Sequence, residues 1–203
     1  MNTRIKLSVL LVGIGILLAF LPFNAAKSFY LKPTELLSKS TSGKIYFSAD
    51  QVARFVNNED STIQLIDLRS KKEYKICNIP GSINIPFADL LNPDWEGYLN
   101  QAEVKNIFYG NGDQLANYAW TIVTGLGFEN CFIMTGGLNE WYKTVMLSEF
   151  LGDRITPREN IIFENRFKAR KTFTQINSLP DSLKTQFLAA RRLKEAQLDG
   201  GCE

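Results

Sequence analysis

The chain has 203 residues, of which 45% are hydrophobic and 22% are charged, a composition typical of a globular protein and not of a disordered one. Its formal net charge of +2 is too small to indicate a nucleic-acid partner. The sequence contains no histidine, which excludes Ser-His-Asp and Cys-His catalysis and zinc sites with histidine ligands. The three cysteines, Cys77, Cys131 and Cys202, are too far apart for a Cys-x-x-Cys motif, so we expect no metal and no cofactor.

The first predicted element is an apolar segment at the N-terminus. Residues 7–23 form a run of 17 residues without a charge, preceded by Arg4 and Lys6. The run is longer than the usual signal-peptide core of about 7–15 residues and at the short end of the roughly 17–25 that span a bilayer. Residues 1–27 are therefore a signal peptide or a membrane anchor, and we favour an anchor because a small residue is missing from the expected cleavage position at Phe23 or Asn24.

The charges around this segment predict its orientation. Positive residues precede the apolar run and Lys27 alone follows it closely, which places the N-terminus in the cytoplasm and the rest of the chain on the other side of the membrane. That compartment is the periplasm if the source is bacterial, or the exterior if the signal is cleaved. Residues 28–44 are mixed and polar and predict a linker, with one helical turn at residues 35–37.

Residues 45–147 alternate short apolar runs with amphipathic stretches, which predicts an α/β domain with a mainly parallel sheet. We expect a helix capped by Ser48 and running through Val56, a helix from Gln114 to about Gly127 with Asp113 as its N-cap, and a last helix from about Asn139. The predicted strands are residues 45–47, 62–68, 83–85, 107–109 and 131–134.

A glycine-bearing turn follows the fourth predicted strand and opens a long helix. Consecutive backbone N–H groups at such a turn, together with the partial positive charge of the helix N-terminus, suit an anion. The turn contains no nucleophilic side chain of the cysteine or serine kind. We therefore predict an anion-binding loop formed by Gly110, Asn111, Gly112, Asp113, Gln114, Leu115 and Ala116.

Two groups of residues resemble the signatures of rhodanese-like domains. Residues 66–70 read Ile-Asp-Leu-Arg-Ser, Glu73 and Tyr74 follow, and residues 78–86 read Asn-Ile-Pro-Gly-Ser-Ile-Asn-Ile-Pro. The second group is Gly-Phe-Glu-Asn at residues 127–130, Gly-Gly-Leu at residues 136–138, and Trp141. The resemblance implies five parallel strands flanked by helices. It also implies that Asp67 and Arg69 brace the loop, although an ordinary surface ion pair is the alternative.

The loop departs from the pattern of active members of this family. In those proteins a cysteine begins the turn and takes a sulfur atom from a donor such as thiosulfate, and the resemblance places that cysteine at Gly110. An arginine often binds the anionic donor, but this loop has no cation and Asp113 adds negative charge. We therefore lean against an enzyme and expect a pseudoenzyme whose ligand is an unknown protein or a small anion.

The remaining thiols keep a second function open. Cys131 lies in an apolar run and is predicted to be a core residue. Cys77 lies near the strand end beside the loop, and Cys202 lies in a Gly-Gly-Cys-Glu tail, so both are candidate reactive thiols. The sequence favours a membrane-tethered, exported binding or regulatory module. The alternative is a sulfur carrier, sulfurtransferase or redox protein that uses Cys77 or Cys202.

Residues 148–203 form an extension beyond the family resemblance. We expect one helix at residues 158–176, with Ile162, Ala169, Phe173 and Ile176 on one side, and a second from Ser178 to about Leu198. Aromatic residues interleaved with basic ones would suit an anionic membrane surface. The alternatives are a helical hairpin packed on the domain and a solvated tail.

Overall fold

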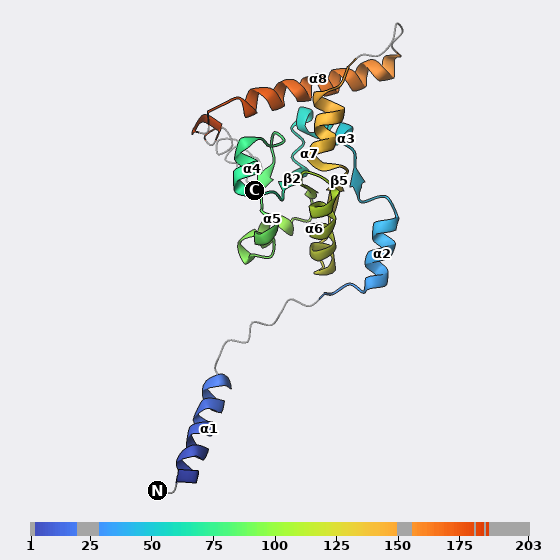
Figure 1. Cartoon of the computed structure of the whole chain (residues 1–203). Helices are drawn as coiled ribbons and strands as arrows, with labels where there is room; N and C mark the ends of the chain where they lie inside the picture. The colour runs from blue at the N-terminus through green and yellow to red at the C-terminus, as the bar shows by residue number, and fades with distance from the viewer. Residues whose placement is uncertain (1–2, 20–28, 150–155, 181, 185, 187–203) are drawn as a thin grey trace, which may run out of the picture.

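A computed structural model describes residues 3–19, 29–149, 156–180, 182–184 and 186 of the chain (Figure 1). Its centre is a five-stranded, fully parallel sheet with the strand order β1-β5-β4-β2-β3. The strands are β1 Tyr46–Phe47, β2 Ile63–Asp67, β3 Ile83–Asn84, β4 Lys105–Tyr109 and β5 Cys131–Met134. The five predicted strands are confirmed, each within about two residues of its expected ends.

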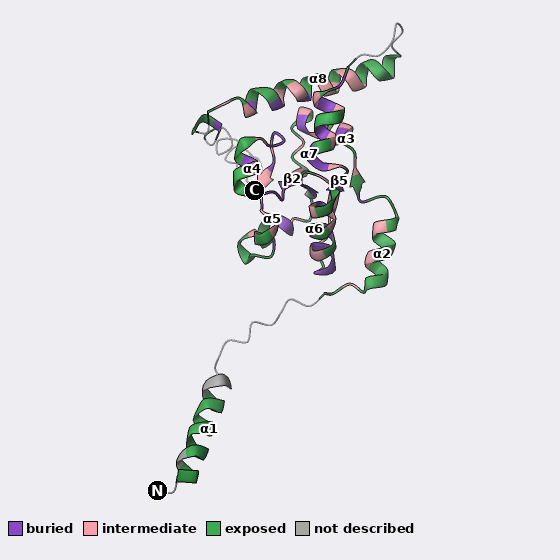
Figure 2. Cartoon of the chain, in the orientation of Figure 1, coloured by how far each residue is buried: buried purple, intermediate pink, exposed green. Residues whose placement is uncertain are grey.

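Helices cover both faces of the sheet, so the central strands are buried on both sides. In β4, Ile107 and Tyr109 pack into one core layer and Phe108 into the other, as the alternation of side chains along a strand requires. The first layer includes residues from α3 Ala49–Asn58, α7 Gly137–Trp141 and α8 Pro157–Asn177; residues from α6 Asp113–Gly125, α5 Glu96–Leu99 and α2 Pro33–Thr41 pack into the second. Figure 2 shows the buried residues concentrated in the sheet and on the helix sides that face it.

The start of α6 differs from the prediction. The N-cap is Gly112, in an extended conformation, and Asp113 is the first helical residue. The prediction that Asp113 caps the helix was wrong because its carboxylate accepts a hydrogen bond from the Gly136 N–H, in the turn after β5. The Ser48 cap of α3 is confirmed, since its hydroxyl accepts from the Gln51 N–H at 3.3 Å.

Several short elements were not anticipated. They are α4 Lys71–Ile76, the 3₁₀ turns Phe87–Asp89 and Pro93–Trp95, α5, and a π-helical turn at Tyr142–Met146 that extends α7. A local signal for α4 is present in the sequence: Ser70 and Glu73 form a capping box, in which each side chain bonds the backbone of the other residue. The last helix of the domain begins at Gly137, two residues before the expected start.

The segment before β1 is more ordered than the predicted linker with one helical turn. It contains the nine-residue helix α2, and the half-buried Leu36 packs against the second core layer. Upstream, the N–H groups of Tyr30 and Leu31 donate to the Gly125 carbonyl at 2.8 and 3.3 Å, at the C-terminal end of α6. The Phe29 ring lies against Gly125, where any Cβ would be 2.9 Å from it. Residues 29–41 are thus docked on the domain.

The C-terminal extension also packs on the domain, through α8. The predicted inward side chains Ala169, Phe173 and Ile176 are buried, whereas Ile162 is half-buried. Arg166 forms two hydrogen bonds with the Asp50 carboxylate of α3, at 2.6 and 2.7 Å. The predicted second helix lies mostly outside the described residues, apart from helical residues at 182–184 and 186.

Two amides join the end of α8 to the loop before β3. Asn78 is fully buried and its N–H donates to the Asn177 side-chain oxygen at 3.0 Å, while the Asn177 amide donates to the Asn78 carbonyl at 2.9 Å. The buried Lys184 ammonium donates to the Lys75 carbonyl at 2.9 Å and to the Asn177 side chain at 2.8 Å. The extension therefore reaches the segment that follows α4.

The N-terminal apolar segment forms the helix α1 Thr3–Ala19. The large apolar side chains described between Ile5 and Ile16 are exposed, with exposed fractions of 45–64%. Figure 2 shows this helix as exposed wherever its side chains are described. Within the described ranges, no helix combines the length and the apolar character needed to cross a bilayer.

Candidate functional site

The loop of residues 110–116 lies at the carboxyl end of β4, flanked by the ends of β2 and β5. This edge is where the turns of a parallel α/β sheet converge on a ligand. No side chain caps the N-terminus of α6, so the N–H groups of its first turn are left without an intrahelical or capping partner. The first turn of α6 therefore presents backbone donors at this edge of the sheet, whereas anion binding by the loop stays a prediction.

The turn after β5 holds the loop from one side. The Leu138 N–H donates to the Gly110 carbonyl at 2.9 Å, and the Asn139 N–H donates to the Asn111 carbonyl at 3.0 Å. Gly137, which directly precedes these two residues, has a φ of +54°, and a Cβ on it would lie 2.5 Å from the Gly110 oxygen. A glycine is required at 137 both by the left-handed backbone and by the close approach of the loop.

The ion pair Asp67–Arg69, at the end of β2, contacts the loop from the side of that strand. The two side chains are 0% and 4% exposed, so they are not the surface ion pair that the sequence left open. The guanidinium binds both carboxylate oxygens, with Nε 3.0 Å from Oδ1 and a terminal nitrogen 2.6 Å from Oδ2. It also donates to the Cys77 carbonyl at 2.7 Å and to the Asn111 side-chain oxygen at 3.4 Å. Arg69 thereby connects β2, the loop before β3 and the candidate site.

The electrostatics of this pair favour a permanently charged arginine. Burial alone would lower the pKa of Arg69, but the hydrogen bonds and the charge of Asp67 outweigh it and raise the pKa above its usual range. Because Asp67 neutralises the guanidinium at close range, Arg69 supplies the loop with a hydrogen-bond donor and little net positive charge.

Glu73 is a site residue that the sequence reasoning missed. Its Oε1 accepts from the Asn111 amide at 3.1 Å, and its Oε2 accepts from the Ser70 hydroxyl at 2.6 Å. Hydrogen bonds from Ser70 and then from Asn111 hold the pKa of Glu73 below its usual range. The Asn111 side chain is therefore fixed between Arg69 and Glu73, and the capping box at Ser70 was the available sequence signal.

Gly110 stands at the first position of the loop and has space for a side chain. A Cβ there would lie 3.3 Å from the Leu115 Cβ, a tight contact that a shift of a few tenths of an ångström relieves, and its backbone is not left-handed. At Gly112 a Cβ would meet nothing within 4 Å. Side chains can thus be introduced at both positions without rebuilding the loop.

The three cysteines have different environments. Cys131 is a buried core residue, as predicted, and burial raises the pKa of its thiol to about 12. Cys77 is half-buried and lies close to Tyr142, whose pKa is raised by burial and then by Cys77. Tyr142 comes from the π-helical turn, and no local pattern indicates this contact. Cys202 lies outside the described residues.

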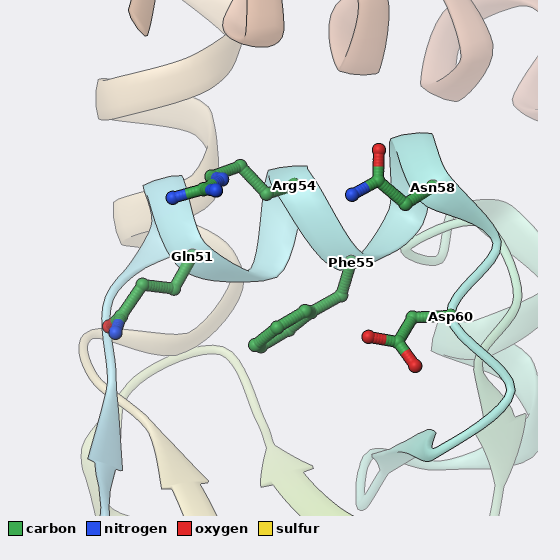
Figure 3. A pocket seen from close by; sticks show the side chains of 5 residues that line it. All are labelled: Gln51, Arg54, Phe55, Asn58 and Asp60. Carbon is green, nitrogen blue, oxygen red and sulfur yellow. The ribbon is translucent and has the colours of Figure 1, made fainter.

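An open hollow of about 300 Å³ lies beside α3 and contains none of the predicted site residues (Figure 3). It is lined by Gln51, Arg54, Phe55, Asn58 and Asp60. Across the described part of the chain, no group of three or more cysteine, aspartate or glutamate side chains is placed to hold a metal ion.

Comparisons with known proteins point to one family. The family model for the rhodanese-like domain matches residues 48–144. The thiosulfate:glutathione sulfurtransferase of Saccharomyces cerevisiae is 29% identical over 118 residues, which are 53% of this chain and 85% of that protein. The adenylyltransferase and sulfurtransferase uba4 of Ogataea parapolymorpha is 34% identical over 82 residues, or 40% of this chain and 20% of that protein.

Other relatives are similar to this chain over a smaller part of their own length. The centrosomal protein of 41 kDa from Homo sapiens is 35% identical over 85 residues, which are 39% of this chain and 23% of that protein. The chain thus spans about a fifth to a quarter of the length of uba4 and of the centrosomal protein. A solved Bacillus halodurans structure is 26% identical, with a TM-score of 0.46, and the match covers 55% of this chain and 82% of that one.

Proposed function

Residues 48–144 are a rhodanese-like domain, and we propose that this domain is a binding or regulatory module that does not transfer sulfur through its loop. The observation that carries the proposal is Gly110 at the first position of the loop. Sulfur transfer from thiosulfate needs a thiolate that attacks the outer sulfur atom. A new sulfur–sulfur bond then forms, the bond inside thiosulfate breaks, and sulfite leaves with its electron pair. Glycine has no atom that can perform the attack.

The surroundings of Gly110 support the same proposal. An active loop needs positive charge to bind thiosulfate and to lower the pKa of the attacking thiol. Here the nearby guanidinium of Arg69 is paired with Asp67, and Asp113 adds a carboxylate at the first position of α6. Contacts with Gly137, Arg69 and Glu73 hold the loop in place. A loop held in this way suits the binding of a ligand without sulfur transfer.

Restoring the missing groups tests this proposal. The Gly110→Cys/Gly112→Arg variant adds a thiol and a cation at two positions that have space, and leaves the Asp113–Gly136 contact in place. We expect wild-type protein to form no thiocyanate from thiosulfate and cyanide above a Cys77→Ser/Cys131→Ala/Cys202→Ser control. The double variant should exceed that background by roughly a hundredfold, the order that one placed catalytic group contributes. Wild-type activity above the cysteine-free control would contradict the proposal.

Cys77 supports a second candidate function, a sulfur carrier or redox protein. Its thiol is free and half-buried, and its carbonyl accepts a hydrogen bond from Arg69, which also contacts Asn111 in the loop. Cys202 is the other candidate thiol for this function. Under this alternative a persulfide would form on Cys77 or Cys202 after incubation with a sulfur donor.

We further propose that residues 1–27 tether the domain to a membrane, with the domain on the non-cytoplasmic side. The exposed apolar side chains of α1 and the basic residue Arg4 before them support this proposal. Full-length protein should float with liposomes in a density gradient. Val12→Arg should release it, because a charge at the centre of a membrane segment costs about 2.5–3.5 kcal/mol. Ser38→Arg, with the same charge on α2, should still float; flotation unchanged by Val12→Arg would reject the tether.

A further inference from the structure

The C-terminal end of α8 is joined to the rhodanese-like domain by a pair of polar contacts. Asn177 is the last residue of α8 and lies outside the residues that the family model matches. Its side-chain oxygen accepts from the Asn78 N–H at 3.0 Å, and its amide donates to the Asn78 carbonyl at 2.9 Å. Figure 1 shows this end of α8 beside α4. One side chain of the extension therefore binds both backbone groups of Asn78.

Burial makes these two contacts decisive for the position of Asn78. The residue is 0% exposed, and its own side-chain amide donates to the Tyr74 carbonyl at 3.0 Å. A buried backbone group that loses its partner costs more free energy than an exposed one, because water cannot replace the lost hydrogen bond. The backbone at Asn78 therefore depends on Asn177.

A buried cation strengthens the same junction. The Lys184 ammonium, on a residue that is 4% exposed, donates to the Asn177 side-chain oxygen at 2.8 Å and to the Lys75 carbonyl at 2.9 Å. Lys75 lies in the last turn of α4, where backbone carbonyls lack intrahelical partners and a cation is favourable. The ammonium thus fixes the Asn177 side chain and ties the end of α4 to the extension.

The segment that Asn177 holds also contacts Arg69. The carbonyl of Cys77, the residue before Asn78, accepts from the Arg69 guanidinium at 2.7 Å. The same guanidinium donates to the side-chain oxygen of Asn111, the second residue of the loop, at 3.4 Å. The contacts therefore run without a break from the end of α8, through this buried backbone, to the loop.

A ring contact joins α8 to the same region. The Phe173 ring, one turn before Asn177, packs edge-on against Tyr142 with a centroid distance of 5.6 Å. Tyr142 in turn lies close to Cys77. Cys77 is therefore near α8 in two ways, through its chain neighbour Asn78 and through Tyr142. Its thiol is a natural reporter of whether α8 is in place.

We propose that Asn177 is a positioning residue for the loop of residues 110–116 and acts on it through Asn78 and Arg69. The candidate site then extends beyond the family domain, and the C-terminal extension determines how firmly the loop is held. By thermodynamic linkage, a ligand that fixes the loop also tightens the extension on the domain. This inference goes beyond the proposed function and is independent of sulfur transfer.

The accessibility of Cys77 measures the first step of this coupling. Full-length protein that contains Cys202→Ser is labelled with a maleimide in detergent, and the labelling reports Cys77 because Cys131 is buried. We expect Asn177→Ala to raise the labelling rate of Cys77 about tenfold, the ratio that corresponds to hydrogen bonds worth about 1.4 kcal/mol together. The matched control is Gln175→Ala, at an exposed position of the same helix, which should leave the rate within about twofold.

The NMR signals of the loop measure the second step, which a merely structural role of Asn177 would not change. The Asn111 side-chain amide and the Arg69 guanidinium should shift in Asn177→Ala and keep their wild-type positions in Gln175→Ala. Asn177→Asp retains an oxygen that can accept from both present donors. Its labelling rate and its loop signals should therefore lie between those of the wild type and of Asn177→Ala.

Faster labelling together with shifted loop signals supports the inference. Faster labelling with unchanged loop signals would show that Asn177 only fastens the extension, and an unchanged labelling rate would show that it does not hold the segment; either result overturns the inference. If Asn177→Ala does not fold, Lys184→Met is measured in its place, with the same two changes expected. Thiocyanate formation is measured separately, so failure of this inference leaves the proposed lack of sulfur transfer intact.

Discussion

Arg69→Leu is expected to lower the free energy of unfolding by about 3–5 kcal/mol, the usual cost of removing one partner of a buried ion pair. The change leaves the Asp67 carboxylate, which is 0% exposed, without its bidentate partner. It also removes the hydrogen bonds to the Cys77 carbonyl and to Asn111. Urea unfolding followed by the fluorescence of the buried tryptophans Trp120 and Trp141 measures the effect.

An exposed ion pair provides the control for Arg69. Lys71→Ala removes a contact of 4.0 Å to Asp89, on a lysine that is 75% exposed, and should change stability by less than about 0.5 kcal/mol. The double variant Asp67→Leu/Arg69→Leu has neither charge, so it should recover part of the free energy of unfolding that Arg69→Leu loses. A loss below about 1 kcal/mol for Arg69→Leu would mean that the pair does not brace this edge of the sheet.

Gly137→Ala is expected to cost about 2–4 kcal/mol and to disturb the loop. The left-handed φ of +54° costs an L-residue roughly 1–2 kcal/mol, and the new Cβ would lie 2.5 Å from the Gly110 carbonyl oxygen. That oxygen is backbone and cannot rotate away, so the contacts between the β5–α7 turn and the loop must shift. Amide chemical shifts of Gly110 and Asn111 should move in the variant, alongside the lower unfolding midpoint.

Gly112→Ala is the matched control within the same loop. Its backbone is extended, with φ of −141°, and a Cβ there would meet nothing within 4 Å. The substitution should be neutral or stabilising by up to about 1 kcal/mol, because alanine restricts the unfolded chain. Similar losses for both alanine variants would contradict the account of Gly137, since they would show that the loop tolerates no side chain at either glycine.

Local patterns in the sequence were sufficient for the strands and for the main helices. The apolar run ending at Tyr109 predicts a strand, which the structure shows to be buried on both faces, and the glycine-bearing turn after it predicts the loop. The alternate positions of Asp67 and Arg69 predict that they share a face. Their burial could not be predicted, because it depends on partners distant in sequence: the Cys77 carbonyl and Asn111.

The misassigned cap of α6 has a similar cause. Asp113 is a good N-cap residue by propensity, but the Gly136 N–H from the neighbouring turn competes for its carboxylate. The reciprocal amide contacts of Asn78 and Asn177 join residues 99 positions apart, and the contact of Tyr142 with Cys77 arises from a π-helical turn. None of these contacts has a periodic or local signature, so only the assembled fold reveals them.

Intact-mass spectrometry after incubation with thiosulfate tests the central claim most directly. The account predicts that wild-type protein gains no sulfur atom, whereas Gly110→Cys/Gly112→Arg gains one sulfur atom that peptide mapping places on residue 110. The control is the same double variant with serine in place of the new cysteine. A persulfide on Cys77 or Cys202 of the wild-type protein would contradict the account and establish the sulfur-carrier alternative.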